Sequence, residues 1–222
     1  MGTLHLVRHG QASFGSDNYD QLSALGQRQC QRLGEYWRAR GQRFDAVICG
    51  TLVRHAQSLE AICDGLGMAP APLLWPGLNE YDSAAVIAAI HPQPLAKPDT
   101  PALYKHHFGL LRKGLAAWMA GQTLPAGMPS HAGFVAGVDS ALDHVRQHCE
   151  GEVLLVSSGG PIATAVGRVL GTAPEVTIEL NMRIRNSAVT EFVFNPKRHM
   201  LLSFNALPHL DTDACRDWIS YA

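Results

Sequence analysis

The chain has 222 residues, which suits one α/β domain or one core with a sizeable insert. Hydrophobic residues make up 46% and charged residues 17%, a balance that excludes a largely disordered chain. The 18 basic and 19 acidic side chains leave a formal net charge of −1. This charge predicts no basic surface for nucleic acid and no polybasic patch for a membrane.

Five cysteines are scattered along the chain without forming a CxxC pair. They indicate reduced thiols rather than a disulfide framework or a zinc knuckle. No apolar run approaches the roughly 20 residues that a membrane span needs, and the N-terminus reads as a strand without a basic-then-apolar leader. A soluble, cytoplasmic protein is therefore expected.

The first third of the chain alternates between predicted strands and helices. Thr3–Val7 is short and largely apolar, which is typical of a buried strand. Leucines recur at helical spacing in residues 20–41, and a glycine ends that predicted helix. A second strand is predicted at 44–50 and a second helix at 52–67. Residues 71–82 are predicted to be extended and rich in turns.

The pattern changes in the middle of the chain, where two predicted helices flank a proline-rich loop. We expect residues 83–145 to form a helical cap or insert within a single domain that spans residues 1–222. From residue 83 onward the sequence predicts helices at 83–93, 101–121 and 133–148, a strand at 152–158, a helix at 159–171, and a hairpin of two strands at 187–196 and 199–205.

This alternation predicts an α/β fold, a three-layer α/β/α sandwich with a mostly parallel central sheet. Ligands of such sheets bind outside the carboxyl ends of the strands. Arg8, His9 and Gly10 follow the first predicted strand, and the glycine pair Gly159 and Gly160 follows the strand at 152–158. Both stretches are therefore expected at the ligand-binding edge.

The Arg8–His9 pair combines two chemistries suited to phosphate. Arginine is a planar, permanently charged fork that matches phosphate oxygens, and a neutral imidazole is a nucleophile or base near pH 7. Gly10 allows close approach of the backbone to a ligand. Taken alone, an Arg-His dipeptide is also typical of an ordinary surface.

The wider context makes the pair specific. The chain carries, in order, "RHGQ", "LSALGQRQ", "CGTLVRHAQSLEAI", "GLNEYD" and "LLSFNALPHL". Together these segments resemble the histidine phosphatase superfamily, also called the phosphoglycerate mutase-like family, over nearly the whole chain.

The resemblance implies a role for each of four residues. His9 would take up the phosphoryl group as phosphohistidine, and Arg8 and Arg54 would bind phosphate oxygens. Glu80 would protonate the leaving oxygen and later activate water. Fixed cations and a carboxyl with a raised pKa are what phosphoryl transfer needs. The alternatives from the residues alone are a helix surface charge for Arg54 and a solvated loop residue for Glu80.

The sequence departs from the family at one position. Ser158 stands where the family has a histidine that contacts the phosphoryl oxygens. A charged hydrogen bond contributes roughly 1.5–3 kcal/mol, about ten- to a hundred-fold in rate. Ser158 can still donate one hydrogen bond, and the turn at Gly159 presents backbone N–H groups and a helix dipole to phosphate. We expect a slowed or specialised site; the alternative is that Ser158 only caps the helix.

Other histidines give no clear substitute and no metal site. His55 follows Arg54, His131 precedes a helix and is a speculative substitute, and His209 is expected to be structural. His106 and His107 are adjacent on a predicted helix and point about 100° apart, which makes a poor metal clamp. No strong metal-ligand set is apparent.

The predicted cap carries a locally basic segment. Its cationic and imidazole side chains either bind a second anionic group of the substrate or form a solvated helix face, which is the more common outcome. The segment comprises Lys105, His106, His107, Arg112 and Lys113.

The function expected from these features is a phosphomonoesterase that acts on a small phosphorylated metabolite through phospho-His9, without a cofactor. A phosphoglycerate mutase is less expected, because the second histidine is absent and the cap diverges. A non-catalytic phosphate-binding module is the third alternative, motivated by Ser158. No nucleic-acid or membrane partner is expected, and a homodimer is left open.

Overall fold

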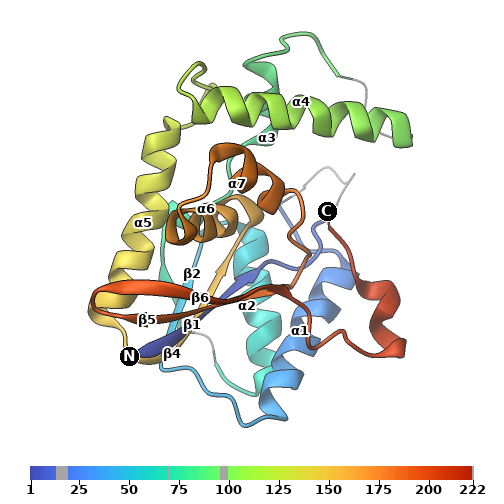
Figure 1. Cartoon of the computed structure of the whole chain (residues 1–222). Helices are drawn as coiled ribbons and strands as arrows, with labels where there is room; N and C mark the ends of the chain where they lie inside the picture. Colours follow the sequence, from blue (N-terminus) through green and yellow to red (C-terminus); the bar gives the residue numbers. More distant parts are fainter. Residues whose placement is uncertain (14–19, 70, 96–99, 222) are drawn as a thin grey trace.

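The computed structural model describes residues 1–13, 20–69, 71–95 and 100–221. In this part of the chain, six strands form one sheet in the order β3-β2-β4-β1-β5-β6, with helices packed around it (Figure 1). The strands are β1 (Gly2–Arg8), β2 (Ala46–Cys49), β3 (Leu73–Leu74), β4 (Gly151–Ser157), β5 (Val189–Asn195) and β6 (Arg198–Ala206). The helices are α1 (Ala24–Arg38), α2 (Val53–Leu66), α3 (Ser83–Ala88), α4 (Pro101–Met119), α5 (His131–His148), α6 (Gly159–Leu170) and α7 (Pro174–Asn181), with 3₁₀ turns η1 (Pro76–Leu78) and η2 (Asp213–Trp218).

The sheet is mostly parallel, as predicted. Strands β1 to β4 pair in parallel, whereas β5 runs antiparallel to both β1 and β6. The predicted C-terminal hairpin is confirmed, with Asn195 opposite Arg198 at its turn. The three-layer α/β/α prediction is therefore confirmed, with one antiparallel strand.

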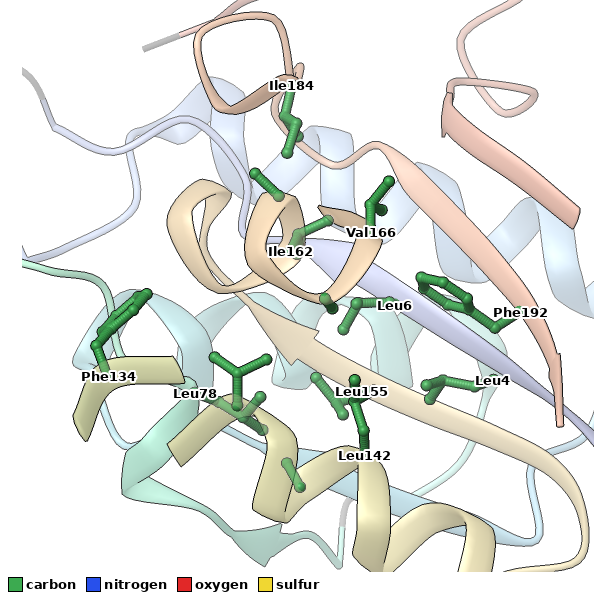
Figure 2. Close-up of a cluster of buried hydrophobic side chains, with 14 of the residues drawn as sticks. Leu4, Leu6, Leu78, Phe134, Leu142, Leu155, Ile162, Val166, Ile184 and Phe192 are labelled. Carbon is green, nitrogen blue, oxygen red and sulfur yellow. The ribbon is translucent and has the colours of Figure 1, made fainter. Parts of the chain in front are cut away.

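Side chains alternate between the two faces of the sheet and build a core on each. On β1, Leu4 and Leu6 join the larger core, whereas Val7 joins the core formed with α1 and α2. Figure 2 shows the larger core, where residues from the sheet meet residues from the helices. Among those labelled there are Leu6, Leu155 and Phe192 of the sheet and Leu142, Ile162 and Val166 of the helices.

The expected insert at 83–145 contains two kinds of helix. Helices α3 and α4 stand away from the sheet at one end of the molecule (Figure 1). Helix α5 instead runs along the sheet and places Val138, Leu142 and Val145 in the larger core. Among the described residues of the predicted insert, α3 and α4 thus lie farther from the sheet than α5, and the cap stays a prediction.

Three helical elements were not predicted from the sequence. Helix α7 begins with Pro174 in its first turn, η1 lies within the segment predicted to be extended, and η2 lies near the C-terminus. All five cysteines are free thiols. Across the described segments, no helix is both long and apolar enough to cross a membrane.

Candidate active site

The ends of β1 and β4 bring the two sequence motifs together. The strands pair in parallel from Gly2 opposite Gly151 to Arg8 opposite Ser157. The His9 N–H then donates to the Ser157 carbonyl at 2.9 Å. Because parallel strands end at the same edge of the sheet, the chain segments after β1 and β4 share one site.

His9 is buried and held in one tautomer. Only 3% of the surface of His9 is exposed, and its Nδ1 lies 2.7 Å from the Gly10 carbonyl oxygen. A carbonyl only accepts, so Nδ1 carries the hydrogen and Nε2 keeps its lone pair. Burial, with the charges of Arg8 and Arg54, lowers the pKa of His9 well below its usual value. The imidazole is therefore neutral at pH 7 and has a nucleophilic nitrogen.

The two predicted phosphate-binding arginines come from separate segments. Arg8 directly precedes His9 in the chain, and Arg54 belongs to helix α2. The Arg8 guanidinium donates to the carbonyl of Ile184 and, at 2.6 Å, to the carbonyl of Tyr221. The charges of both arginines lower the pKa of His9 and of Glu80. Their electrostatic effect therefore reaches both groups, and phosphate binding by the two arginines stays a prediction.

Asp20 fixes Arg54 in place. Its carboxylate accepts from Arg54 Nη1 at 2.8 Å and from the Val53 N–H at 3.0 Å. It therefore stabilises the positive N-terminus of α2 as well as the guanidinium. Sequence reasoning did not single out Asp20, because a carboxylate that reaches a helix end from a distant loop leaves no local pattern.

Glu80 reaches the site from the loop after η1. Both carboxyl oxygens lie 3.1 Å from the Gly160 nitrogen, which donates to them at the start of α6. A methyl group at Gly160 would lie 2.1 Å from Glu80 Oε1, so glycine is required for this approach. Burial raises the pKa of Glu80, although the Gly160 N–H and the two arginines oppose the increase. A carboxyl with a raised pKa suits a general acid.

Hydrogen bonds tie the Glu80 loop to its neighbours. Ser157 Oγ donates to the Leu78 carbonyl at 2.7 Å. The Asn79 side chain accepts from the Thr51 N–H at 2.7 Å and donates to the Thr51 hydroxyl at 2.6 Å. The loop before α2 and the loop before α3 are therefore held as one unit against the end of β4.

The start of α6 is where these groups converge. A methyl group at Gly159 would lie 2.8 Å from Asn181 Oδ1, 3.7 Å from Glu80 Oε2 and 3.8 Å from Arg8 Nε. Asn181 also donates to the Tyr81 hydroxyl at 2.7 Å and was missed from the sequence. Of the predicted site residues, Arg8, His9, Ser158 and Gly159 lie at the edge where β1 and β4 end and α6 begins. Arg54 comes from the first turn of α2 and Glu80 from the loop after η1. Their catalytic and binding roles stay predictions.

Ser158 does not act as a side-chain cap. It is the N-cap residue of α6, but its hydroxyl makes no cap hydrogen bond. Its Oγ lies instead 2.7 Å from Nε2 of His55, and both residues are fully buried. The His55 ring centroid lies 5.9 Å from that of His9. The alternative that Ser158 only caps the helix is therefore wrong.

Comparison with known proteins identifies the family. A sequence model of the Histidine phosphatase superfamily (branch 1) matches residues 4–207. The chain belongs to the histidine phosphatase superfamily. None of the curated protein sequences matches it.

Solved structures share the fold of this histidine phosphatase superfamily member at low identity. YhfR from Bacillus stearothermophilus has a TM-score of 0.67 at 16% identity and covers 94% of this chain and 99% of its own. Phosphoserine phosphatase from Entamoeba histolytica, in complex with 3-phosphoglyceric acid, has 0.64 at 20%, with coverage of 95% and 100%. Alpha-ribazole phosphatase from Shigella flexneri has 0.62 at 19%, with 92% and 96%.

The other histidines of this superfamily member lie in different surroundings. His131 packs edge-on against Trp118, with 5.1 Å between ring centroids. His209 Nε2 lies 2.9 Å from the Ser187 hydroxyl, in the C-terminal part of the chain. Within the described ranges, no three His, Cys, Asp or Glu side chains are grouped so that they could hold a metal ion. In the basic segment, Arg112 Nε pairs with Glu179 at 2.7 Å.

Proposed function

We propose that the protein is a phosphomonoesterase that hydrolyses a small phosphorylated metabolite through a phosphohistidine on His9. The observation that carries this proposal is the Nδ1 hydrogen bond of His9 to the Gly10 carbonyl, 2.7 Å long. It leaves Nε2 as the nucleophile of a neutral, buried ring, with Arg8 and Arg54 around it. The chemistry uses only side chains of this chain and water.

In the first step, His9 Nε2 attacks phosphorus and the bond from phosphorus to the leaving oxygen breaks. Glu80 gives its proton to that oxygen, so an alcohol leaves rather than an alkoxide. Arg8 and Arg54 stabilise the charge on the equatorial oxygens. In the second step, water attacks phosphorus, Glu80 takes a proton from it, and the N–P bond breaks to release inorganic phosphate.

The relatives named for phosphoserine and alpha-ribazole phosphate hydrolysis support a small phosphorylated metabolite as substrate. The void beside the Gly160 contact of Glu80, bordered by Tyr81, Trp118 and Phe134, has a volume of about 20 Å³. It has room for about one water and is not a substrate pocket.

The test is phosphate release from p-nitrophenyl phosphate and from a panel of sugar, amino-acid and nucleotide phosphates, with EDTA present. His9→Ala should abolish turnover, while His148→Ala, an exposed histidine on α5, should leave it unchanged. Wild type mixed with substrate should show an acid-labile phosphohistidine by ³¹P NMR. Equal rates for wild type and His9→Ala would refute the proposal, and phosphoglycerate isomerised faster than phosphate is released would make the enzyme a mutase.

A further inference from the structure

The His55–Ser158 pair is a buried polar contact that the proposed chemistry has not used. His55 occupies the first turn of α2, directly after Arg54, and Ser158 follows the last residue of β4. The two side chains meet at 2.7 Å, and neither is exposed. A buried contact between two polar groups is costly unless its hydrogens are well placed.

The surroundings of His55 decide which of its nitrogens carries the hydrogen. Burial lowers the pKa of His55 to about 3, so the ring is neutral. Nδ1 has no hydrogen-bond partner among the described atoms and faces Gly50, where a methyl group would lie 2.2 Å from it. A buried N–H without an acceptor is less tolerated than a lone pair without a donor. The hydrogen therefore lies on Nε2.

This tautomer determines what Ser158 does. With the hydrogen on Nε2, His55 donates and Ser158 Oγ accepts. The hydroxyl hydrogen of Ser158 must then point to a different acceptor. Ser158 is adjacent to Gly159, where Arg8 Nε and Glu80 Oε2 converge within 4 Å of one point, and the His55 ring lies 5.9 Å from that of His9. Besides Glu80 Oε2, a phosphoryl oxygen bound at His9 would be an acceptor in this location.

We propose that His55 is a positioning residue, which donates to Ser158 and so commits the Ser158 hydroxyl to donate to a phosphoryl oxygen. The inference rests on the proposed function for the identity of the anion. The pair then supplies, from α2 and β4 together, the contact that a single histidine at position 158 would make in the family pattern. The contact is thus relayed through two residues rather than lost.

Two substitutions at position 55 distinguish the hydrogen bond that His55 donates from the volume that its ring fills. His55→Gln keeps an N–H donor at a similar distance from the backbone, whereas His55→Leu fills a similar volume without one. We expect His55→Leu to weaken vanadate binding and to lower kcat on p-nitrophenyl phosphate, each roughly ten- to a hundred-fold, the range of a lost hydrogen bond to a charged group. His55→Gln should recover most of this loss, with KM changed less than kcat.

Ser158→Ala tests whether the effect passes through the serine. Ser158→Ala should lower vanadate affinity and kcat as much as His55→Leu does. The double variant should lose no more than either single variant, because both substitutions remove the same relay. Losses that multiply in the double variant would overturn the inference. So would equal vanadate affinity in wild type and His55→Leu, or equal behaviour of His55→Gln and His55→Leu. Melting temperatures of all variants identify any that fail to fold.

A swap provides an independent check. A histidine at 158 would need space that the His55 ring holds, since the present contact is 2.7 Å. Ser158→His alone should therefore destabilise the protein, while Ser158→His with His55→Ala should restore vanadate binding to near the wild-type value. If wild type forms no phosphohistidine but His55→Leu still loses vanadate affinity, the proposed function fails and this inference stands. If the swap binds vanadate no better than His55→Ala alone, the inference is overturned.

Discussion

Two buried histidines lie in opposite surroundings, His5 in the middle of β1 and His9 directly after its end. His5 lies between two carboxylates, with Nε2 2.7 Å from Glu152 and Nδ1 3.4 Å from Glu191. Burial lowers its pKa, but these two carboxylates overcome that effect and the net pKa is raised. His9, four residues later, is equally buried among arginines, and its pKa is lowered well below the usual value.

The glutamates near the two histidines differ in the same way. The hydrogen bond to His5 lowers the pKa of Glu191, whereas burial raises that of Glu80. The carboxylates around His5 favour its protonated form, whereas burial and the arginines keep His9 neutral. The same residue types are therefore arranged for an internal ion pair around His5 and, in the proposed function, for an acid and a nucleophile at Glu80 and His9.

The largest loss of activity is expected when the carboxyl of Glu80 is removed. Glu80→Gln should lower kcat on an alkyl phosphate roughly 10²–10⁴-fold, because the leaving alkoxide then has no proton donor. The loss should be much smaller for p-nitrophenyl phosphate, whose leaving group needs no proton. Steady-state kinetics on both substrates gives the comparison. Glu152→Gln, the matched change beside His5, should leave both rates unchanged. A similar loss in Glu152→Gln would contradict the assignment of Glu80 as the proton donor.

Removing a cation beside His9 should have the next largest effect. Arg54→Gln should lower kcat/KM about 10²–10³-fold, as expected for one lost contact to the charge of the transition state. Arg54→Lys should fall between it and wild type, since a lysine keeps the charge without the planar fork. Initial rates at low substrate measure the effect. Arg146→Gln, which removes the partner of Asp143 on α5, serves as control. An unchanged kcat/KM for Arg54→Gln would place this guanidinium outside the site.

The ion pairs of His5 with Glu152 and Glu191 should affect the stability of the protein rather than its catalytic rate. The pKa of His5 is raised on folding, so its stabilisation is complete below the unfolded value near 6.5 and is lost as the pH rises through the folded pKa. Glu191→Gln should therefore lower the free energy of unfolding by about 1 kcal/mol at pH 6 and by less at pH 9. Urea unfolding at the two pH values tests this, with Glu150→Gln as an exposed control. A greater loss at pH 9 would reverse the assigned charge of His5.

The smallest effect on activity is expected from charged residues of α4, away from both His5 and His9. Replacing Lys105 and Lys113 of α4 by alanine should change kcat/KM on a simple monoester by less than about twofold, because exposed charges contribute little. The same pair assayed on a substrate with a second phosphate tests the alternative predicted from the sequence. A selective loss on that substrate would show that α4 binds a second anionic group.

The sequence predicted the layers of the fold because strand and helix periodicity are local properties. It also placed the segments after β1 and β4 at one edge, since parallel strands end together. The contacts of His5 were not predictable, because Glu152 and Glu191 approach it only through the order of β4, β1 and β5 in the sheet. A histidine in an apolar strand looks the same with or without carboxylate neighbours.

The contact between His55 and Ser158 illustrates the same limit at the site. The sequence marked Ser158 as a departure and His55 as a histidine without a role, but their meeting depends on how the first turn of α2 lies against the end of β4. Asp20 and Asn181 were missed for the same reason, since each joins the site from a separate segment. Side-chain pairs set by tertiary packing leave no periodic pattern in the chain.

The central position of β1 has a consequence for how the chain folds. Its first residue, Gly2, pairs with Gly151 on one side and with Phe194 on the other. During synthesis, β1 is made well before its two neighbours β4 and β5, and such distant pairings form slowly. Until then its two unpaired edges are open to aggregation. In refolding, catalytic activity should therefore return later than helical signal.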